Sequence, residues 1–155
     1  MNISPELDLV FEKHLDISPE QAFHGWTTPS MLTRWFCPDP WKTIEAEVDL
    51  RPGGKFNTVM QSPDGEKNYN FGCILEVIPG KKLITTDALV ENYRPTANNF
   101  CTINLSFLPD ELGCKVYAIV SHKDNETKKK HEEMGFYEGW GIAHDQLEAA
   151  VKGLR

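Results

Sequence analysis

The sequence predicts an α+β protein in which a curved antiparallel sheet of six or seven strands wraps one long C-terminal helix, with two short helices near the N-terminus. Two observations predict this architecture. Between residues 41 and 121, runs of alternating apolar and polar residues are separated by short turn signals, a pattern typical of antiparallel strands. Between residues 126 and 154 there is no proline, and apolar residues recur every three or four positions, as on one face of a helix.

The N-terminal part predicts one strand and two helices. Residues 7–15 alternate imperfectly between apolar and polar side chains and indicate an opening strand. Ser18 suits the N-cap of the helix that follows, because Pro19 fits the first helical position and Glu20 favours the positive end of the helix dipole. A second short helix is expected from Pro29 to Trp35. Two short helices in succession typically close one end of a sheet or barrel.

The middle of the chain predicts six further strands. They cover approximately residues 41–50, 55–61, 69–77, 82–89, 100–108 and 114–121. Turn signals such as Pro52-Gly53-Gly54 and Pro63-Asp64-Gly65 separate them, and residues 91–98 are expected to form a loop. The strand at 69–77 is marked by apolar residues at alternate positions from Tyr69 to Val77. Consecutive strands joined by short turns pair antiparallel, so residues 1–155 are expected to form a single domain.

The expected last helix carries its apolar stripe at Phe136, Trp140, Ala143, Leu147, Ala150 or Val151, and Leu154. The opposite face carries Glu138, Asp145, Gln146 and Lys152. Gly135, Gly139 and Gly141 lie in its first half, and each costs about 1 kcal/mol of helix stability relative to alanine. Either the backbone approaches the sheet closely at these glycines, or the helix leaves space there for a ligand. The two explanations can coexist.

Composition and charge exclude several classes of partner. The net charge is −7, which disfavours nucleic acid and anionic membrane surfaces. No apolar run approaches the roughly 20 residues that span a bilayer, and the N-terminus does not resemble a signal peptide. The four cysteines are scattered without a C-x-x-C pair and are expected to be reduced thiols. We therefore expect a cytoplasmic protein.

The order of several short motifs resembles a known family. These motifs are Asp49-Leu50-Arg51-Pro52-Gly53-Gly54, Gly72-Cys73-Ile74-Leu75-Glu76-Val77-Ile78-Pro79, Leu83-Ile84, and Gly139-Trp140 followed by Leu147. Together they resemble the family of domains that are similar to the C-terminal domain of the activator of heat-shock protein 90 ATPase. This family belongs to the START-like, or SRPBCC, superfamily. The resemblance covers nearly the whole chain. One departure is Cys114, where members often carry threonine.

The resemblance implies the helix-grip fold, also called birch-pollen-allergen-like, with a deep cavity between helix and sheet that often holds small apolar molecules. It does not imply one chemistry, since the superfamily includes lipid carriers, aromatic-polyketide cyclases and co-chaperone domains. This chain is too short to hold the additional N-terminal domain of the eukaryotic co-chaperone, so ATPase activation is not expected.

No known catalytic or metal motif is complete in the sequence. His131-Glu132-Glu133-Met134-Gly135 begins like H-E-x-x-H, but Gly135 stands where the second histidine is needed, so we expect no metal site. His131 is then expected on a solvated helix face. His144, one turn after Trp140, could be a satisfied packing residue, a ligand contact or a general base. Nothing calls for a cofactor, and no catalytic residue is assigned.

Aromatic residues near the expected cavity are the best candidates for ligand contact, because small-molecule sites are commonly apolar pockets with a few polar groups. The expected cavity residues are Trp35, Phe36, Trp41, Phe56, Phe71, Tyr137, Trp140 and His144. The sequence therefore favours a module that binds a small apolar or aromatic molecule. A cyclase or isomerase with His144 or a cavity carboxylate as base stays open, as do a stress-related, co-chaperone-like domain that contacts a chaperone and a homodimeric assembly.

Overall fold

The computed structural model describes residues 2–155, and within them seven strands form one antiparallel sheet. The strand order is β1-β9-β8-β5-β4-β3-β2, with bounds β1 Asp8–Leu15, β2 Lys42–Val48, β3 Lys55–Gln61, β4 Lys67–Ile78, β5 Lys82–Thr86, β8 Thr102–Pro109 and β9 Cys114–Ser121. The helices are α1 Pro19–Thr27, α2 Pro29–Trp35, α3 Asn125–Glu133 and α4 Phe136–Val151. The predicted fold class and the two short N-terminal helices are confirmed.

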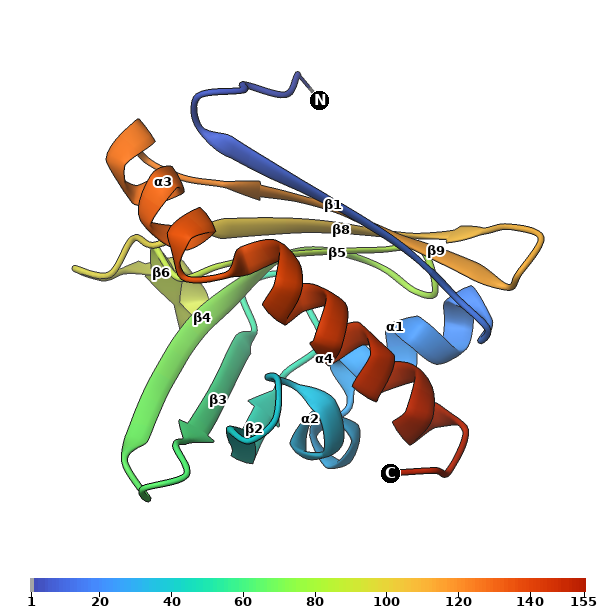
Figure 1. Cartoon of the computed structure of the whole chain (residues 1–155). Helices are drawn as coiled ribbons and strands as arrows, with labels where there is room; N and C mark the ends of the chain where they lie inside the picture. The colour runs from blue at the N-terminus through green and yellow to red at the C-terminus, as the bar shows by residue number, and fades with distance from the viewer. Residues whose placement is uncertain (1) are drawn as a thin grey trace.

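The sheet is strongly bent, and α4 crosses its concave side. In Figure 1, β8 and β9 run across the view whereas β3 and β4 run down it, and α4 runs obliquely through the angle between the two groups. Two features of β4 explain the bend. Its register with β5 shifts between Ile74 and Glu76, which marks a β-bulge. At Gly72 an added Cβ would lie 2.8 Å from the backbone oxygen of Thr86, so only glycine allows the two strands to come this close.

The first strand closes the sheet from the far end of the chain. β1 pairs with β9 along its whole length, from Asp8 opposite Ser121 to Leu15 opposite Cys114. The other neighbours in the sheet follow one another in sequence, apart from the segment between β5 and β8. In that segment β6 Leu89–Val90 and β7 Arg94–Pro95 pair as a small hairpin around a 3-10 turn, where a plain loop was expected.

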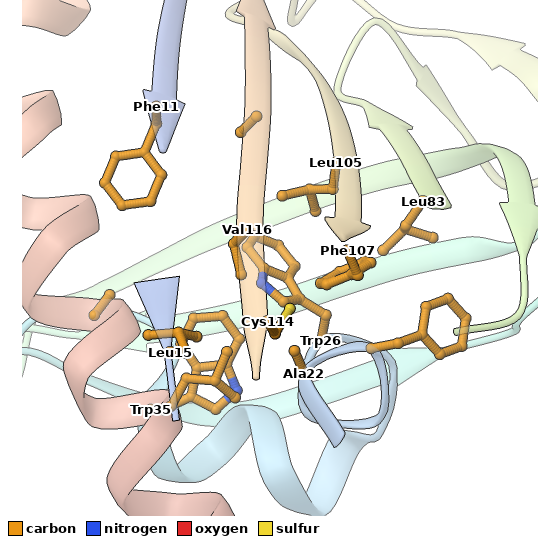
Figure 2. Packing of buried hydrophobic residues seen from close by; sticks show 14 of the residues in the cluster. Phe11, Leu15, Ala22, Trp26, Trp35, Leu83, Leu105, Phe107, Cys114 and Val116 are labelled. Atoms are coloured by element: carbon orange, nitrogen blue, oxygen red, sulfur yellow. The ribbon is translucent and has the colours of Figure 1, made fainter. Parts of the chain in front are cut away.

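The core lies between the inner face of the sheet and helices α1, α2 and α4. Figure 2 shows Leu83, Leu105, Phe107 and Val116 of the sheet facing Trp26 of α1, and all five are buried. Ser18 begins α1 as predicted, because its hydroxyl accepts from the Gln21 backbone N–H while the Gln21 side chain accepts from the Ser18 N–H. The capped helix thus holds its aromatic face against the sheet.

The C-terminal helix is broken where the sequence predicted one continuous helix. Gly135 lies between α3 and α4 with φ of +88°, in the left-handed region that glycine adopts without steric cost. Its N–H donates to the Glu132 carbonyl and closes the end of α3. The expectation of one helix over residues 126–154 is therefore wrong, and α4 alone crosses the sheet.

Two side chains of α4 and the C-terminus also differ from the expected faces. Gln146, expected on the polar face, is buried, and its Nε2 donates to the carbonyls of Trp35 and Cys37 at 2.9 and 2.8 Å. Its Oε1 accepts from the Asp39 N–H at 3.0 Å. Leu154, expected on the apolar stripe, lies beyond the end of α4 and is exposed. The polar side chain of Gln146 is thus buried because it forms hydrogen bonds to the backbone at the end of α2 and in the segment that follows it.

Gly135→Ala should destabilise the protein by about 1–2 kcal/mol, the cost of a left-handed conformation for an L-residue. No atom lies within 4 Å of the added Cβ, so the effect comes from the backbone alone. Gly141→Ala is the matched control, because Gly141 has the same free space inside regular α4 and should gain about 1 kcal/mol. Urea unfolding measures both, and changes of equal sign would contradict the helix break.

Candidate ligand-binding site

A cavity of about 430 Å³ lies between α4 and the inner face of the sheet. α1, α2 and the segment after α2 contribute to one side of it, β3, β4, β5 and β8 to another, and α3 and α4 to the third. Its volume falls in the range of about 300–1,000 Å³ that is usual for small-molecule sites. The fold therefore leaves enough space for one small organic molecule in a cavity that is open to solvent on one side.

Small residues just before α4 and on one side of it leave this space open. Gly135, Gly139 and Ala143 follow one another at four-residue steps and all line the cavity. An added Cβ at Gly139 would meet only Pro38, at 3.7 Å, which is an ordinary contact distance. No atom lies within 4 Å of an added Cβ at Gly135 or Gly141. Close approach to the sheet thus does not require these glycines, and the geometry favours a cavity wall.

Most of the residues expected at the cavity are brought together there. Trp35, Phe36, Phe56, Phe71, Trp140 and His144 all contribute to its wall. Trp41 and Tyr137 do not: Trp41 precedes β2 and is 37% exposed, and Tyr137 is 48% exposed. Tyr137 is next to Phe136 along the helix, and a step of one residue turns a side chain about 100° away from the cavity.

His144 is buried, and both of its ring nitrogens are engaged. Nδ1 lies 2.8 Å from the Trp140 carbonyl oxygen, which can only accept, so Nδ1 carries the proton. Nε2 then accepts from the indole N–H of Trp26 at 3.3 Å. Burial lowers the pKa of His144 to about 4, which keeps the ring neutral. His144 therefore packs as a satisfied neutral ring and has no free lone pair for a substrate proton.

One region of the wall is polar, and the sequence pattern did not identify it. Thr58 of β3 pairs with Asn70 of β4, and both line the cavity together with Asn68 and Thr85. Tyr69, one of the apolar residues that marked β4 in the sequence, alternates with these asparagines and projects to the opposite face, whereas Phe71 borders both the cavity and the opposite face. The signal was present as the alternation Asn68, Asn70, Gly72, but polar residues at alternate positions usually indicate the wet face.

His131 also lines the cavity, although a solvated helix face was expected. Its Nδ1 lies 2.9 Å from Nε2 of His122, whose Nδ1 lies 2.8 Å from the Leu7 carbonyl oxygen. The ring centroids of Phe100 and Phe136 are 4.6 and 5.0 Å from that of His131. Burial, with a smaller effect of His122, lowers the pKa of His131 to about 4. The expectation failed because His122 is distant in the predicted strand pattern and only the fold brings it to α3.

Charge is sparse on the cavity wall. Asp87 is its one carboxylate among residues 2–155, and no lysine or arginine lines it. Oδ1 of Asp87 accepts from the backbone N–H groups of Phe100 and Cys101 at 2.8 and 3.2 Å. Burial, and then the Asp87 charge, raise the pKa of the Cys101 thiol to about 12. This thiol is therefore protonated and unreactive at neutral pH.

A second hollow, of about 540 Å³, lies between α2 and the neighbouring strands β2, β3 and β4, on the outward-facing side of β3 and β4. Tyr69 and Phe71 line it with roughly half of each side chain exposed, and their ring centroids are 6.2 Å apart. Glu45 and Glu47 flank them. This outer groove combines apolar and acidic groups outside the cavity.

Metal-binding and membrane-spanning features are absent from the part of the chain that is described. No three or more His, Cys, Asp or Glu side chains of residues 2–155 are grouped so that they could hold a metal ion. In the same residues no helix is both long enough and apolar enough to cross a membrane.

Comparison with known proteins gives a consistent result. Residues 16–152 match the family described as activator of Hsp90 ATPase homolog 1-like protein. A solved structure from Nitrosomonas europaea is 44% identical, with a TM-score of 0.94 and 97% of each chain covered. A Rhodobacter sphaeroides protein is 22% identical, with a TM-score of 0.82 over 99% of each chain. The AHSA1-like protein of Aeromonas hydrophila is 20% identical, with a TM-score of 0.73 over 96% of each chain. Comparison with curated proteins gave no match.

Proposed function

Because the chain belongs to the activator of Hsp90 ATPase homolog 1-like family, we propose that it binds one small, largely apolar molecule between α4 and the sheet. The sequence resemblance implied both this family and the helix-grip fold, and both are confirmed. The observation that carries the proposal is the 430 Å³ cavity, whose wall combines aromatic rings with a few hydroxyl and amide groups. Such a wall is typical of sites that hold an apolar body and orient one polar end.

Binding is favoured over catalysis by the state of the cavity histidines. His144 has no free nitrogen, and the pKa of His131, about 4, makes its ring a weak base at neutral pH. General-base catalysis is most effective when the pKa of the base lies near the working pH. A cyclase or isomerase would need a stronger base than either histidine provides, and Oδ1 of the one wall carboxylate, Asp87, already accepts from two backbone N–H groups. We therefore propose a carrier or sensor of a small molecule rather than an enzyme.

Gly139→Leu should weaken ligand binding by at least about tenfold, which corresponds to 1.4 kcal/mol. Gly139 lines the cavity, and only Pro38 lies within 4 Å of an added Cβ, so a leucine side chain would occupy ligand space. The change also removes a helical glycine, so the variant should fold at least as stably as the parent. Native mass spectrometry of protein purified from its own host measures the fraction that carries a co-purifying molecule.

Gly141→Leu is the matched control for this experiment. Gly141 lies in the same helix and also has free space around an added Cβ, but it does not line the cavity. It should keep the bound molecule, whereas Gly139→Leu should lose it. Equal retention by both variants, or no bound molecule in the parent protein, would contradict the proposed site.

The outer groove supports one alternative, a stress-related, co-chaperone-like domain that contacts a chaperone. Its specific support is the exposed pair Tyr69 and Phe71 beside Glu45 and Glu47. Exposed apolar groups that are bordered by charge are common in protein-binding surfaces. The alternative requires a complex with a purified Hsp90-type chaperone that is lost in a Tyr69→Ser/Phe71→Ser variant. A pull-down that recovers no chaperone would remove it.

A further inference from the structure

We propose that the cavity selects a ligand that carries a hydrogen-bond donor and no negative charge, because His122 fixes the proton of His131 so that His131 presents only an acceptor. An aromatic or aliphatic alcohol fits this description, and the matching ether or carboxylate does not. This inference rests on the proposed ligand-binding function and adds the chemical class of the ligand to it.

The proton positions follow from a chain of three groups. The Leu7 carbonyl oxygen can only accept, so His122 Nδ1, 2.8 Å away, carries a proton. In a neutral imidazole the other nitrogen is then an acceptor, so Nε2 of His122 accepts from Nδ1 of His131 at 2.9 Å. His131 has thereby used its only proton. Its Nε2 is left with an unshared lone pair, and in residues 2–155 no group donates to it.

The position of the His131 ring is held by its neighbours as well as by His122. Phe100 and Phe136 contact it, and both of them line the cavity together with His131. Asn125 and the Asp124 N-cap fix the start of α3, through bonds to the Glu6 carbonyl and the Thr127 N–H. A ring that is fixed in this way cannot turn over to offer N–H instead of the lone pair. The acceptor is therefore preorganised before a ligand enters.

The surrounding charge acts in the same direction. Phe100, whose ring contacts His131, donates its backbone N–H to the Asp87 carboxylate, so this carboxylate lies at the same end of the cavity. No lysine or arginine lines the wall among the described residues. A ligand carboxylate would lose its hydration without gaining a cation, which is unfavourable. A hydroxyl group can instead donate to His131 Nε2.

Three matched compounds test the selection: 1-naphthol, 1-methoxynaphthalene and 1-naphthoate, titrated by calorimetry at pH 7.5. We expect naphthol to bind about three- to tenfold more tightly than the ether, which is the usual effect of one net hydrogen bond, and naphthoate to bind most weakly. Ether or naphthoate binding as tightly as naphthol would overturn the selection and leave the proposed binding function intact. If none of the three binds, this inference is overturned, and the native mass spectrometry of the parent protein decides separately whether the proposed binding function fails as well.

Variants separate the role of His122 from that of the cavity as a whole. His131→Phe should remove the preference for naphthol over the ether and leave affinity for the ether unchanged. His122→Phe should reduce the preference, because His131 is then free to place its proton on Nε2. His24→Gln is the control, since His24 lies exposed on α1 outside the cavity. A full preference retained in His131→Phe would overturn the proposal.

A direct measurement does not depend on any variant folding. In protein with ¹⁵N-labelled histidine, two-bond ¹H–¹⁵N correlation spectra report which ring nitrogen carries the proton. We expect Nδ1–H in both His122 and His131 at pH 7.5, and a shift of the His131 Nε2 resonance when naphthol is added. A His131 ring protonated on Nε2 in the free protein would overturn the proposed proton positions of His122 and His131.

Discussion

Leu147→Ala should lower the free energy of unfolding by about 2–5 kcal/mol, the range that is usual when a fully buried leucine is truncated. Leu147 has no exposed surface and lies in α4 where that helix contacts α1. Truncation would leave an empty space between the two helices that the bent sheet prevents from collapsing. Urea unfolding monitored by tryptophan fluorescence measures the change, since Trp26 and Trp35 are in the same core.

A second substitution tests whether the loss comes from the α1–α4 contact. An added Cβ at Gly25 would lie 2.3 Å from Cδ1 of Leu147, so Gly25→Ala alone should cost about 1–3 kcal/mol by overpacking. In the Gly25→Ala/Leu147→Ala double variant, Cδ1 of Leu147 is absent, and the methyl group of the new alanine at position 25 occupies part of the space that the leucine side chain filled. Its loss of stability should be clearly smaller than the sum of the single losses. Strict additivity would contradict direct contact between these residues.

Acidification should destabilise the protein through His144 by roughly 3 kcal/mol between pH 7 and pH 4. The pKa of this histidine is about 4 in the folded protein, against about 6.5 for an unperturbed imidazole. Between these values the unfolded chain binds a proton that the folded protein does not, so stability falls as the pH drops below 6.5. Below about pH 4 both states are protonated, and the loss from this group is complete. The half-buried His131 acts in the same direction with a smaller effect.

His144→Gln provides the control for the acid effect. Glutamine cannot titrate in this range, so the slope of unfolding free energy against pH between 6.5 and 4.5 should become smaller. At pH 7 the variant should already be less stable, because it disturbs the bonds to Trp26 and Trp140. Chemical unfolding at several pH values gives both quantities. An unchanged slope would assign the acid sensitivity to other groups.

The sequence was sufficient for most of the fold because local signals agreed with the final structure. The Ser18-Pro19 start of α1 and the turns at Gly53-Gly54 and Asp64-Gly65 depend on a few neighbouring residues and were located correctly. The break at Gly135 is not predicted because glycine can adopt both the helical and the left-handed conformation, so the residue type alone does not show which of the two is present. Only the turn after α3, which depends on tertiary packing, distinguishes them.

The candidate site was harder to predict than the fold for a physical reason. Apolar periodicity describes which face of an element is turned inward, but it does not reveal whether the space beyond that face is filled. Asn68 and Asn70 are exposed, as their sequence pattern indicates, and they also line the mouth of the cavity, which the pattern does not reveal. The His122–His131 contact joins a residue after β9 to one in α3, and no short motif encodes it.

The pairing of β1 with β9 has a consequence for the order of folding. Leu9, Phe11 and Leu15 of β1 belong to the core, but their strand partners in β9 lie between Cys114 and Val120. On the ribosome, β1 must therefore wait until β9 has been synthesised before its apolar side chains find their native neighbours. Contacts between such distant parts of a chain slow folding. Until then the apolar face of β1 lacks its native strand partner and is prone to aggregation.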